Sequence, residues 1–256
     1  MNLGFIGTGE ITKAVVIGIL KSKIKYKKIY ISKRNRKISN FLKIQNKNIK
    51  VLSDNQEIIN KSHMIFLAVT PEVGDKIIKK LKFKNTQTIV SFISTIKYAD
   101  LKKYIRTKSK IVRAIPLPPI AIGTGPVPIY PPNKKVRIFF DKIGKTIEIN
   151  NEKLSLNFWT MSSMMAPYYE MLNHLTTWLI NKGLTKQKAE RYITSLFFGL
   201  SKNAYLHKYE NLKELVKKSQ TPNGLNEQAL KELKRTNFYV KLSNTSNNIL
   251  KRLKGK

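Results

Sequence analysis

Short apolar segments alternate with amphipathic segments along the first 115 residues, and this alternation constrains the fold more than any other feature. The apolar runs end in polar or turn-forming residues, and the segments between them have apolar residues at helical spacing. Strands that alternate with helices at this distance form βαβ units, so a parallel sheet is predicted. The strands are predicted at residues 2–7, 28–32, near 51, 63–69, 88–94 and 110–115, and the helices at 10–22, 36–43, 55–61, 72–82 and 98–105.

The chain changes character after this section. A segment rich in proline and glycine runs from Pro116 to Pro132, and residues 136–149 then predict a helix and a last short strand. Beyond about Glu152 the apolar spacing is helical throughout. The sequence therefore predicts an α/β fold class, with an N-terminal Rossmann-type parallel-sheet domain at residues 1–152 and an all-helical domain at residues 153–256.

A glycine-rich turn stands where the first predicted strand passes into the first predicted helix. A dinucleotide site needs this arrangement, because one glycine makes the tight turn, a second lets the backbone approach the pyrophosphate, and the helix N-terminus supplies free N–H groups. The third small position of the motif is a threonine here, and a plain turn is the alternative interpretation. The residues predicted to hold the pyrophosphate are Gly7, Thr8, Gly9, Glu10, Ile11 and Thr12.

The end of the second strand selects between NAD and NADP. An NAD site usually places Asp or Glu there to bind the ribose 2′-hydroxyl. The sequence has no acidic residue between Glu10 and Asp54, and the strand runs instead into the basic segment 32–36. A hydroxyl with guanidinium groups suits a 2′-phosphate, so we expect an NADP site with Ser32 and Arg34 as contacts. A general excess of basic residues is the alternative.

The strand at 63–69 ends at the carboxyl edge of the predicted sheet. Ligands of open α/β sheets gather at that edge. We therefore expect the backbone of Ala68, Val69, Thr70 and Pro71 to border the nicotinamide half of the cofactor.

Six segments of the chain resemble the pyrroline-5-carboxylate reductase family. GFIGTGEITKAVVIGIL is similar to the opening strand, turn and helix of the family, FLAVTPE to its FLAVKP segment, and VRAIPLPPIAIGTG to VRxMPNTPAxxGxG. In the second half, MAPYYEMLN resembles GSGPAYxxxxxxAL, KGLTKQKAERYITSLFFGLSKNAY the next long helix, and TPNGLNEQALKEL the SPGGTTxxALxxL segment. The matches follow the family order and cover nearly the whole chain.

The resemblance implies a cofactor domain followed by a helical domain that dimerises, with NADPH as hydride donor, no metal and an imino-acid substrate. It implies a homodimer or a higher oligomer of dimers. Asn55 matches a family position that touches the adenosine side of the cofactor, although an Asn there also suits a plain turn.

The turn before the predicted helix at 225 matches the family's substrate loop. Unpaired N–H groups at such a helix end suit the substrate carboxylate. An ordinary cap with Thr221 is the alternative. The residues assigned to the substrate are Thr221, Asn223, Gly224 and Asn226.

The chain departs from the family pattern mainly in the substrate half. Leu117 and Pro118 stand where the family has Asn-Thr, Asn223 replaces the first Gly of a Gly pair, and Asn226 replaces a Thr. Residues 164–166, Met-Met-Ala, replace the family's GSG. The leading expectation is the NADPH-dependent reduction of 1-pyrroline-5-carboxylate to L-proline. Reduction of a different imino or keto acid stays open.

No acid–base pair stands out as a catalytic site. The carbon of a protonated C=N group is already electrophilic, so hydride transfer to it needs positioning more than proton transfer by the protein. Tyr169 and Glu170 are polar groups on an otherwise apolar helix, and either could assist protonation. A core or interface role is the alternative, and no catalytic residue is assigned.

The net charge of +34 leaves a third class of function open, a non-catalytic protein that senses NADP or binds nucleic acid. The positive charge is spread over both halves, without a basic tail or an RNA-binding motif. A general basic bias is therefore the preferred interpretation, and a nucleic-acid partner is not expected.

Metal, membrane and export functions are also not expected. The chain has no cysteine, and His63, His174 and His207 lack ligand spacing. No apolar run is long enough to span a membrane, and the first residues do not have the pattern of a signal peptide. We expect a cytoplasmic protein. The apolar segment 154–181 predicts a helix buried between two subunits, with a monomer core as the alternative.

Overall fold

The computed structural model describes residues 1–206 and 211–255 and divides into two compact units, Met1–Trp159 and Thr160–Lys256. The helix α7 (Glu152–Ser162) spans the division. The predicted domain boundary, after residue 152, falls at the start of this helix.

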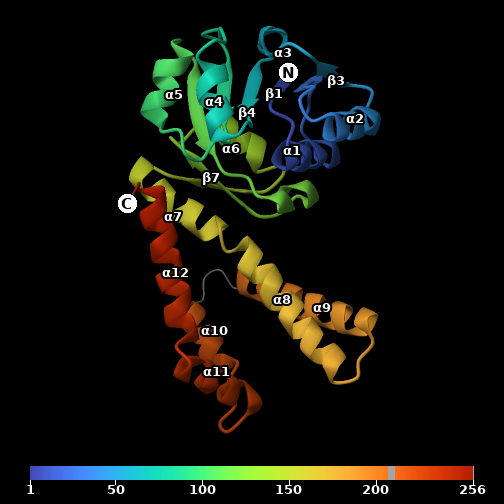
Figure 1. Cartoon of the computed structure of the whole chain (residues 1–256), viewed down its shortest axis with the longest axis vertical. Helices are drawn as coiled ribbons and strands as arrows, with labels where there is room; N and C mark the ends of the chain where they lie inside the picture. Colours follow the sequence, from blue (N-terminus) through green and yellow to red (C-terminus); the bar gives the residue numbers. More distant parts are fainter. Residues whose placement is uncertain (207–210, 256) are drawn as a thin grey trace. The chain divides into compact units, whose positions relative to one another are not determined.

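The first unit is built on one sheet. Within the described residues, eight strands lie in the order β3-β2-β1-β4-β5-β6-β7-β8. Figure 1 shows this sheet among its helices, with β1, β3, β4 and β7 labelled. The first six pair with their neighbours in parallel, and the strand order reverses beside β1. These strands are β1 (Leu3–Ile6), β2 (Ile29–Ser32), β3 (Ile49–Leu52), β4 (Met64–Leu67), β5 (Thr88–Ser91) and β6 (Lys110–Ala114).

The strand β7 (Pro126–Tyr130) lies in the segment for which the sequence predicts no element. It pairs antiparallel with β6 and parallel with β8 (Lys145–Glu148), so the expectation of a parallel sheet is wrong at this strand. Prolines at 126 and 128 cannot donate hydrogen bonds to a neighbouring strand, and this concealed the strand in the sequence. The Pro128 carbonyl still accepts a hydrogen bond from the Ile115 N–H at 3.1 Å.

Helices cover both faces of the sheet. One apolar cluster joins the sheet to α1, α2 and α6, and a second joins the other face to α3, α4 and α5. Because both faces are covered, ligands reach the sheet at the ends of its strands. The helices are α1 (Glu10–Lys21), α2 (Arg36–Gln45), α3 (Asn55–Lys61), α4 (Pro71–Ile78), α5 (Tyr98–Ile105) and α6 (Lys134–Phe140).

The segment after β6 packs closely on α1. It forms a short 3₁₀ helix, η1 (Pro118–Ile122). A Cβ atom at Gly18 would lie 2.5 Å from the Ile120 carbonyl oxygen. The close packing of this segment on α1 therefore requires a glycine at position 18. Leu117 and Pro118, which depart from the family pattern, lie at the start of this anchored segment.

A buried arginine fastens the start of α7 to the sheet. Arg113 of β6 is 3% exposed, and its guanidinium pairs with the Glu152 carboxylate and lies 4.4 Å from the centre of the Trp159 ring. The same carboxylate accepts a hydrogen bond from the Tyr98 N–H at 2.7 Å. Burial lowers the pKa of the Arg113 guanidinium, and the Glu152 charge opposes that shift. We name Arg113, Glu152 and Trp159 the α7 anchor.

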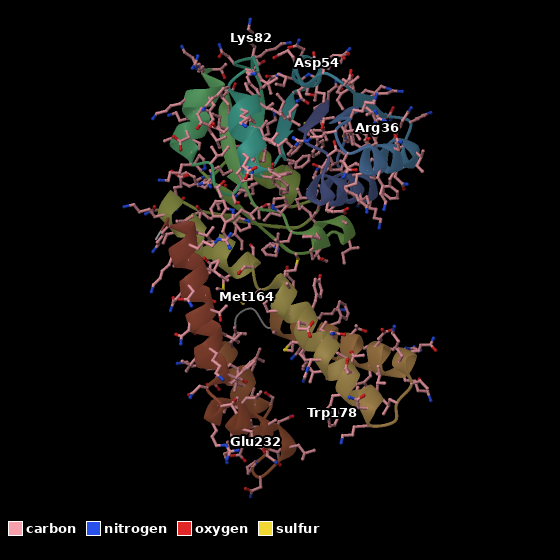
Figure 2. All side chains as sticks on the ribbon, viewed as in Figure 1. Arg36, Asp54, Lys82, Met164, Trp178 and Glu232 are labelled. Atoms are coloured by element: carbon pink, nitrogen blue, oxygen red, sulfur yellow. The ribbon has the colours of Figure 1, made fainter. Side chains whose placement is uncertain are left out.

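The second unit is helical, which together with the mostly parallel sheet confirms the expected fold class. The apolar segment 154–181 forms parts of two helices. Trp159 near its start is buried, but Trp178 is 55% exposed and Tyr169 is 53% exposed. Trp178 is labelled in Figure 2. Burial between two subunits therefore stays the prediction for the exposed part of this segment, with a monomer core as the alternative. After α7 come α8 (Met165–Asn181), α9 (Lys186–Leu206), α10 (Leu212–Lys218), α11 (Leu225–Arg235) and α12 (Phe238–Leu253).

Candidate functional site

The turn after β1 depends on Gly7. Its φ angle is +100°, a conformation that residues with a side chain rarely adopt. A Cβ atom at Gly7 would lie 2.4 Å from the backbone carbonyl oxygen of Ala68, at the end of β4. The glycine therefore lets the turn lie directly against the end of the neighbouring strand.

Hydroxyl groups hold this turn in place. The Gly7 N–H donates to Oγ of Ser32 at 3.0 Å, and the Thr8 hydroxyl donates to the Ser32 carbonyl oxygen at 2.5 Å. The Thr12 hydroxyl donates to the Gly7 carbonyl oxygen at 2.8 Å. All three hydroxyl-bearing residues are buried. Thr12 is thus accommodated at the third small position of the motif because its hydroxyl is satisfied within the turn.

Gly9 completes the turn and precedes α1 as its N-cap. Its backbone is extended, with φ −98° and ψ −172°, and a Cβ atom there would meet no atom within 4 Å. The N–H groups of Glu10, Ile11 and Thr12 have no acceptor within α1, because no helical carbonyl precedes them. Open space, free N–H groups and the positive end of the helix dipole together suit a pyrophosphate.

A basic pocket of about 340 Å³ lies beside the turn, where β2 ends. Its positive side chains come from the segment that joins β2 to α2 and from the first residue of α2. That segment has a defined conformation, because the Asn35 side chain caps α2 by accepting a hydrogen bond from the Ile38 N–H at 3.1 Å. No carboxylate lines the pocket, so its charge suits an anion. Its lining residues are Gly7, Ser32, Lys33, Arg34, Arg36, Ser53, Asn55, Val69 and Ile77.

Two further pockets share residues with this one. We name the turn at residues 7–9 the phosphate turn, after the group that it is predicted to hold. A pocket of about 200 Å³ connects this turn, through Arg34, with Ala68, Val69 and Thr70 after β4. A pocket of about 440 Å³ continues from Lys33 and Arg36 past α2. A groove for a ligand longer than a mononucleotide therefore follows the carboxyl edge of β1, β2 and β4.

The predicted cofactor residues gather at this edge with few exceptions. Glu10, Ile11, Thr12 and Pro71 do not line the three pockets. Thr12 belongs to the buried hydrogen bonds of the turn, and Pro71 is the first residue of α4. The residues that do line the pockets are Gly7, Thr8, Gly9, Ser32, Arg34, Asn55, Ala68, Val69 and Thr70.

Three polar residues that line the basic pocket were not among the predicted contacts. Lys33 and Arg36 lie on either side of Arg34 and share its charge. Ser53 directly follows β3, the strand beside β2. Its position at the carboxyl end of a neighbouring strand could have identified it as a contact. A serine hydroxyl is common in ordinary turns, so its residue type alone did not indicate a binding role.

The predicted substrate turn lies in the second unit and leads into α11. Asn223 has a φ of +60°, in the left-handed region where the family has glycine. Asn is among the residues that tolerate this region best, so the turn survives the substitution. Gly224 donates its N–H to the Thr221 carbonyl oxygen at 2.8 Å and serves as the N-cap of α11.

Side chains of α11 stabilise this turn. The Asn226 amide donates to the Ser219 carbonyl oxygen at 2.9 Å, and Glu227 accepts from the Asn223 N–H at 2.7 Å. A hydrogen bond from Lys231 is the main cause that lowers the pKa of Glu227, and the Asn223 N–H adds to it. No side chain caps α11 at its N-cap residue, so the first-turn N–H groups, from Leu225 onward, have no acceptor within the helix. This end of α11 can accept a carboxylate.

Tyr169 and Glu170 lie on α8. Both are exposed in the single chain, and the Glu170 carboxylate contacts the Asn173 amide at 3.5 Å. Across residues 1–206 and 211–255, no group of three or more His, Asp or Glu side chains could hold a metal ion. His207 lies outside the described residues. The same residues contain no helix that is both long and apolar enough to cross a bilayer.

Comparison with protein families assigns the two halves separately. Residues 2–96 match the family described as NADP oxidoreductase, coenzyme F420-dependent. Residues 153–255 match the pyrroline-5-carboxylate reductase dimerisation family. The phosphate turn and the basic pocket fall within the first match, and the turn before α11 falls within the second.

Individual relatives agree with this assignment. The chain is 22% identical to a pyrroline-5-carboxylate reductase of Haemophilus influenzae. The matched region covers 78% of the chain and 77% of that relative. It is 29% identical to pyrroline-5-carboxylate reductase 3 of Danio rerio, over 49% of the chain and only 44% of that protein. A crystal structure of Plasmodium falciparum pyrroline carboxylate reductase with NADP bound has a TM-score of 0.85, at 20% identity and with 100% of the chain and 97% of that structure covered. This likeness shows a shared fold.

Proposed function

Because the chain belongs to the pyrroline-5-carboxylate reductase family, we propose that it reduces 1-pyrroline-5-carboxylate to L-proline with NADPH as the hydride donor. The observation that carries this proposal is the phosphate turn, with open space at Gly9, beside a basic pocket that has no carboxylate. The proposal is also supported by the order of the two matches, with the NADP oxidoreductase match at residues 2–96 before the dimerisation match at residues 153–255. The resemblance seen in the sequence is confirmed by these matches.

The residues of the first unit fit NADPH. The backbone at Gly9 leaves room for a pyrophosphate, and the first-turn N–H groups of α1 would donate to it. Arg34, with Lys33 and Arg36 beside it, would hold the 2′-phosphate. The Ser32 hydroxyl already bonds to Gly7 and Thr8, so we assign it the task of shaping the turn as well as lining the pocket. When bound, the cofactor supplies a hydride from its nicotinamide ring.

The residues of the turn before α11 fit the carboxylate of the substrate. Thr221, Asn223 and Gly224 shape the turn, and the free N–H groups at the start of α11 would donate to the anion. Asn226 holds the turn to the Ser219 carbonyl. The protein's contribution to the reaction is then to orient the imine and exclude water, because the protonated C=N carbon needs no further activation.

Two other functions remain as alternatives. A different imino or keto acid is suggested by Leu117, Pro118, Asn223 and Asn226, where the chain departs from the family. Steady-state assays of NADPH oxidation with 1-pyrroline-5-carboxylate and a panel of other imino and keto acids separate the two. Turnover of another acid, with none of the pyrroline, would replace the proposed substrate. NADPH binding without turnover of any of them, or salt-sensitive DNA binding alone, would point to a non-catalytic protein.

We propose a homodimer, or an oligomer of dimers, as the working form. The dimerisation family matched at residues 153–255 supports a homo-oligomer. Large apolar side chains that are exposed in a single chain are typical of a protein–protein interface, and a second copy of the chain would bury them. These side chains include Met161, Tyr169, Trp178, Tyr192 and Phe198. The absence of cysteine fits a reducing compartment, and a cytoplasmic location is part of the proposal.

We expect Arg34→Ala to raise the KM for NADPH by about 10- to 100-fold, as the loss of a charge-assisted contact of roughly 1.5–3 kcal/mol implies. The KM for NADH should change little, since NADH has no 2′-phosphate. Steady-state kinetics with both cofactors measures the difference. Lys47→Ala removes the same charge from the loop after α2 and is the control. An equal rise for both cofactors would contradict the assignment of Arg34.

We expect Asn226→Ala to raise the KM for 1-pyrroline-5-carboxylate by about two- to tenfold, since the turn loses a hydrogen bond worth roughly 0.5–1.5 kcal/mol and its alignment with the substrate. The dissociation constant of NADPH should not change. Kinetics and fluorescence titration of NADPH measure the two quantities. A weaker affinity for NADPH with an unchanged substrate KM would mean that the turn serves the cofactor.

A further inference from the structure

A pocket in the first unit lies outside the proposed reaction. Its volume is about 570 Å³, larger than each of the three pockets along the cofactor edge. It includes Lys110, the first residue of β6, the segment after α1, and α6. Lys110 places it at the amino ends of the strands, whereas the cofactor groove follows their carboxyl ends. A ligand here would not compete with NADPH.

The charge of this pocket exceeds the basic bias of the chain. Lys and Arg make up 49 of the 256 residues of the sequence, but six of the eleven residues that line the pocket. None of the eleven is Asp or Glu. Among the ion pairs of the described residues, none includes any of the six lysines. The six are Lys23, Lys25, Lys110, Lys134, Lys135 and Lys142.

The backbone that carries these lysines has a defined conformation. Ser22 fixes the segment after α1, because its hydroxyl accepts a hydrogen bond from the Ile24 N–H at 3.1 Å and donates to the Ile19 carbonyl at 2.9 Å. Asn133 caps α6 by accepting from the Val136 N–H at 3.1 Å. The Lys135 ammonium donates to the buried hydroxyl of Thr88 at 3.3 Å. The pocket is therefore part of the folded unit.

The pocket also has an apolar part. Ile24, Ile138 and Phe139 line it together with the lysines. Walls of low polarity strengthen the field of charges of one sign in a cleft, and the mutual repulsion of these charges is relieved by a ligand with several negative charges. Ammonium groups bind phosphate oxygens as compact point charges. The volume lies within the range of ordinary ligand pockets.

We propose that this pocket binds a small molecule with several phosphate groups and an apolar ring, the chemistry of a nucleoside triphosphate. The lysines would neutralise the phosphates, and Ile24, Ile138 and Phe139 would contact the base. The proposal is independent of the substrate of the reductase, because the site uses no residue of the cofactor groove.

The test is equilibrium binding of ATP to the full chain in the presence of saturating NADPH, which removes ATP binding at the cofactor groove. Lys25→Gln/Lys142→Gln is expected to raise the dissociation constant of ATP about tenfold or more, because two charged contacts are lost. Lys80→Gln/Lys103→Gln removes the same charge from two exposed positions of the first unit, outside the pocket. This control should change the dissociation constant of ATP less than about twofold. Inorganic triphosphate should bind more weakly than ATP, since it cannot contact the apolar residues.

A second measurement does not depend on variants. ATP added to the unmodified protein with NADPH should protect the six pocket lysines from acetylation, as read by mass spectrometry, and leave Lys80 and Lys103 reactive. Equal losses of ATP affinity in the two double variants, equal binding of triphosphate and ATP, or protection spread over all lysines would overturn the proposal, as would no ATP binding at all.

Discussion

Replacing Gly9 with threonine is expected to weaken NADPH binding by at least about a hundredfold, roughly 2.7 kcal/mol, while the stability of the protein stays within about 0.5 kcal/mol. The backbone of Gly9 is extended, which suits a β-branched residue, and a Cβ atom there meets no protein atom within 4 Å. Threonine and glycine are about equally good N-cap residues. The new side chain would therefore fit the protein and occupy only the space that a pyrophosphate needs. Fluorescence titration with NADPH and thermal unfolding measure the two effects.

Gly7→Ala is the matched comparison, two residues away. Its φ of +100° and the approach of 2.4 Å to the Ala68 carbonyl oxygen mean that even one methyl group strains the fold. We expect a loss of stability of roughly 1–3 kcal/mol or more, with weaker NADPH binding as a consequence. If Gly9→Thr binds NADPH as tightly as the unmodified protein, the pyrophosphate does not lie at this turn.

Glu152→Ala is expected to reduce the free energy of unfolding of the first unit by about 3–5 kcal/mol, because it leaves the Arg113 charge buried without its partner. Arg113 is 3% exposed, and the Tyr98 N–H also loses its acceptor. The α7 anchor would lose the pair that attaches the first turn of α7 to the sheet. Denaturant unfolding, followed by circular dichroism, measures the loss.

Two variants control for this effect. Glu57→Ala removes a carboxylate from an exposed pair with Lys61, and we expect it to cost less than about 1 kcal/mol. Arg113→Met/Glu152→Leu removes both charges of the anchor and should be more stable than Glu152→Ala, since an apolar pair needs no partner. A loss of stability in Glu152→Ala no larger than in Glu57→Ala would contradict the role given to the α7 anchor.

Much of the first unit could be predicted because its strands are short and apolar. The run at 63–69 contains the buried strand β4, and the helix predicted at 98–105 coincides with α5. The phosphate turn was visible because the glycines stand between a strand and a helix at the start of the chain. These features are local, so periodicity and turn chemistry reveal them.

Features that depend on distant contacts were not visible in the sequence. The strand β7 contains two prolines, and its pairing with β6 and β8 outweighs their poor strand propensity. The sequence does not distinguish Arg113 from the many other basic residues. Its role depends on contacts with Glu152 and Trp159, which only the fold brings close to it. Ser32 was predicted from its position at the end of β2, but its hydrogen bonds with Gly7 and Thr8 depend on how two strands meet.

The turn before α11, our proposed substrate turn, shows the same difference between local and distant features. The sequence showed that Asn223 departs from the family's glycine, and only the φ of +60° shows that the departure preserves the turn. The sequence also could not show that Asn226 bonds to the Ser219 carbonyl. The identity of the acid that we propose to bind there depends on contacts with the bound molecule, and neither the local sequence pattern nor the fold specifies those contacts.

The central claim, that this chain transfers a hydride from NADPH to 1-pyrroline-5-carboxylate, is tested most directly by isotope transfer. The purified protein is incubated with 1-pyrroline-5-carboxylate and NADPH deuterated at the transferring position of nicotinamide C4, and the products are analysed by mass spectrometry. We expect L-proline with one deuterium at C5, formed in step with NADPH oxidation. Oxidation of NADPH without labelled proline, or no oxidation while the protein binds NADPH, would contradict the claim.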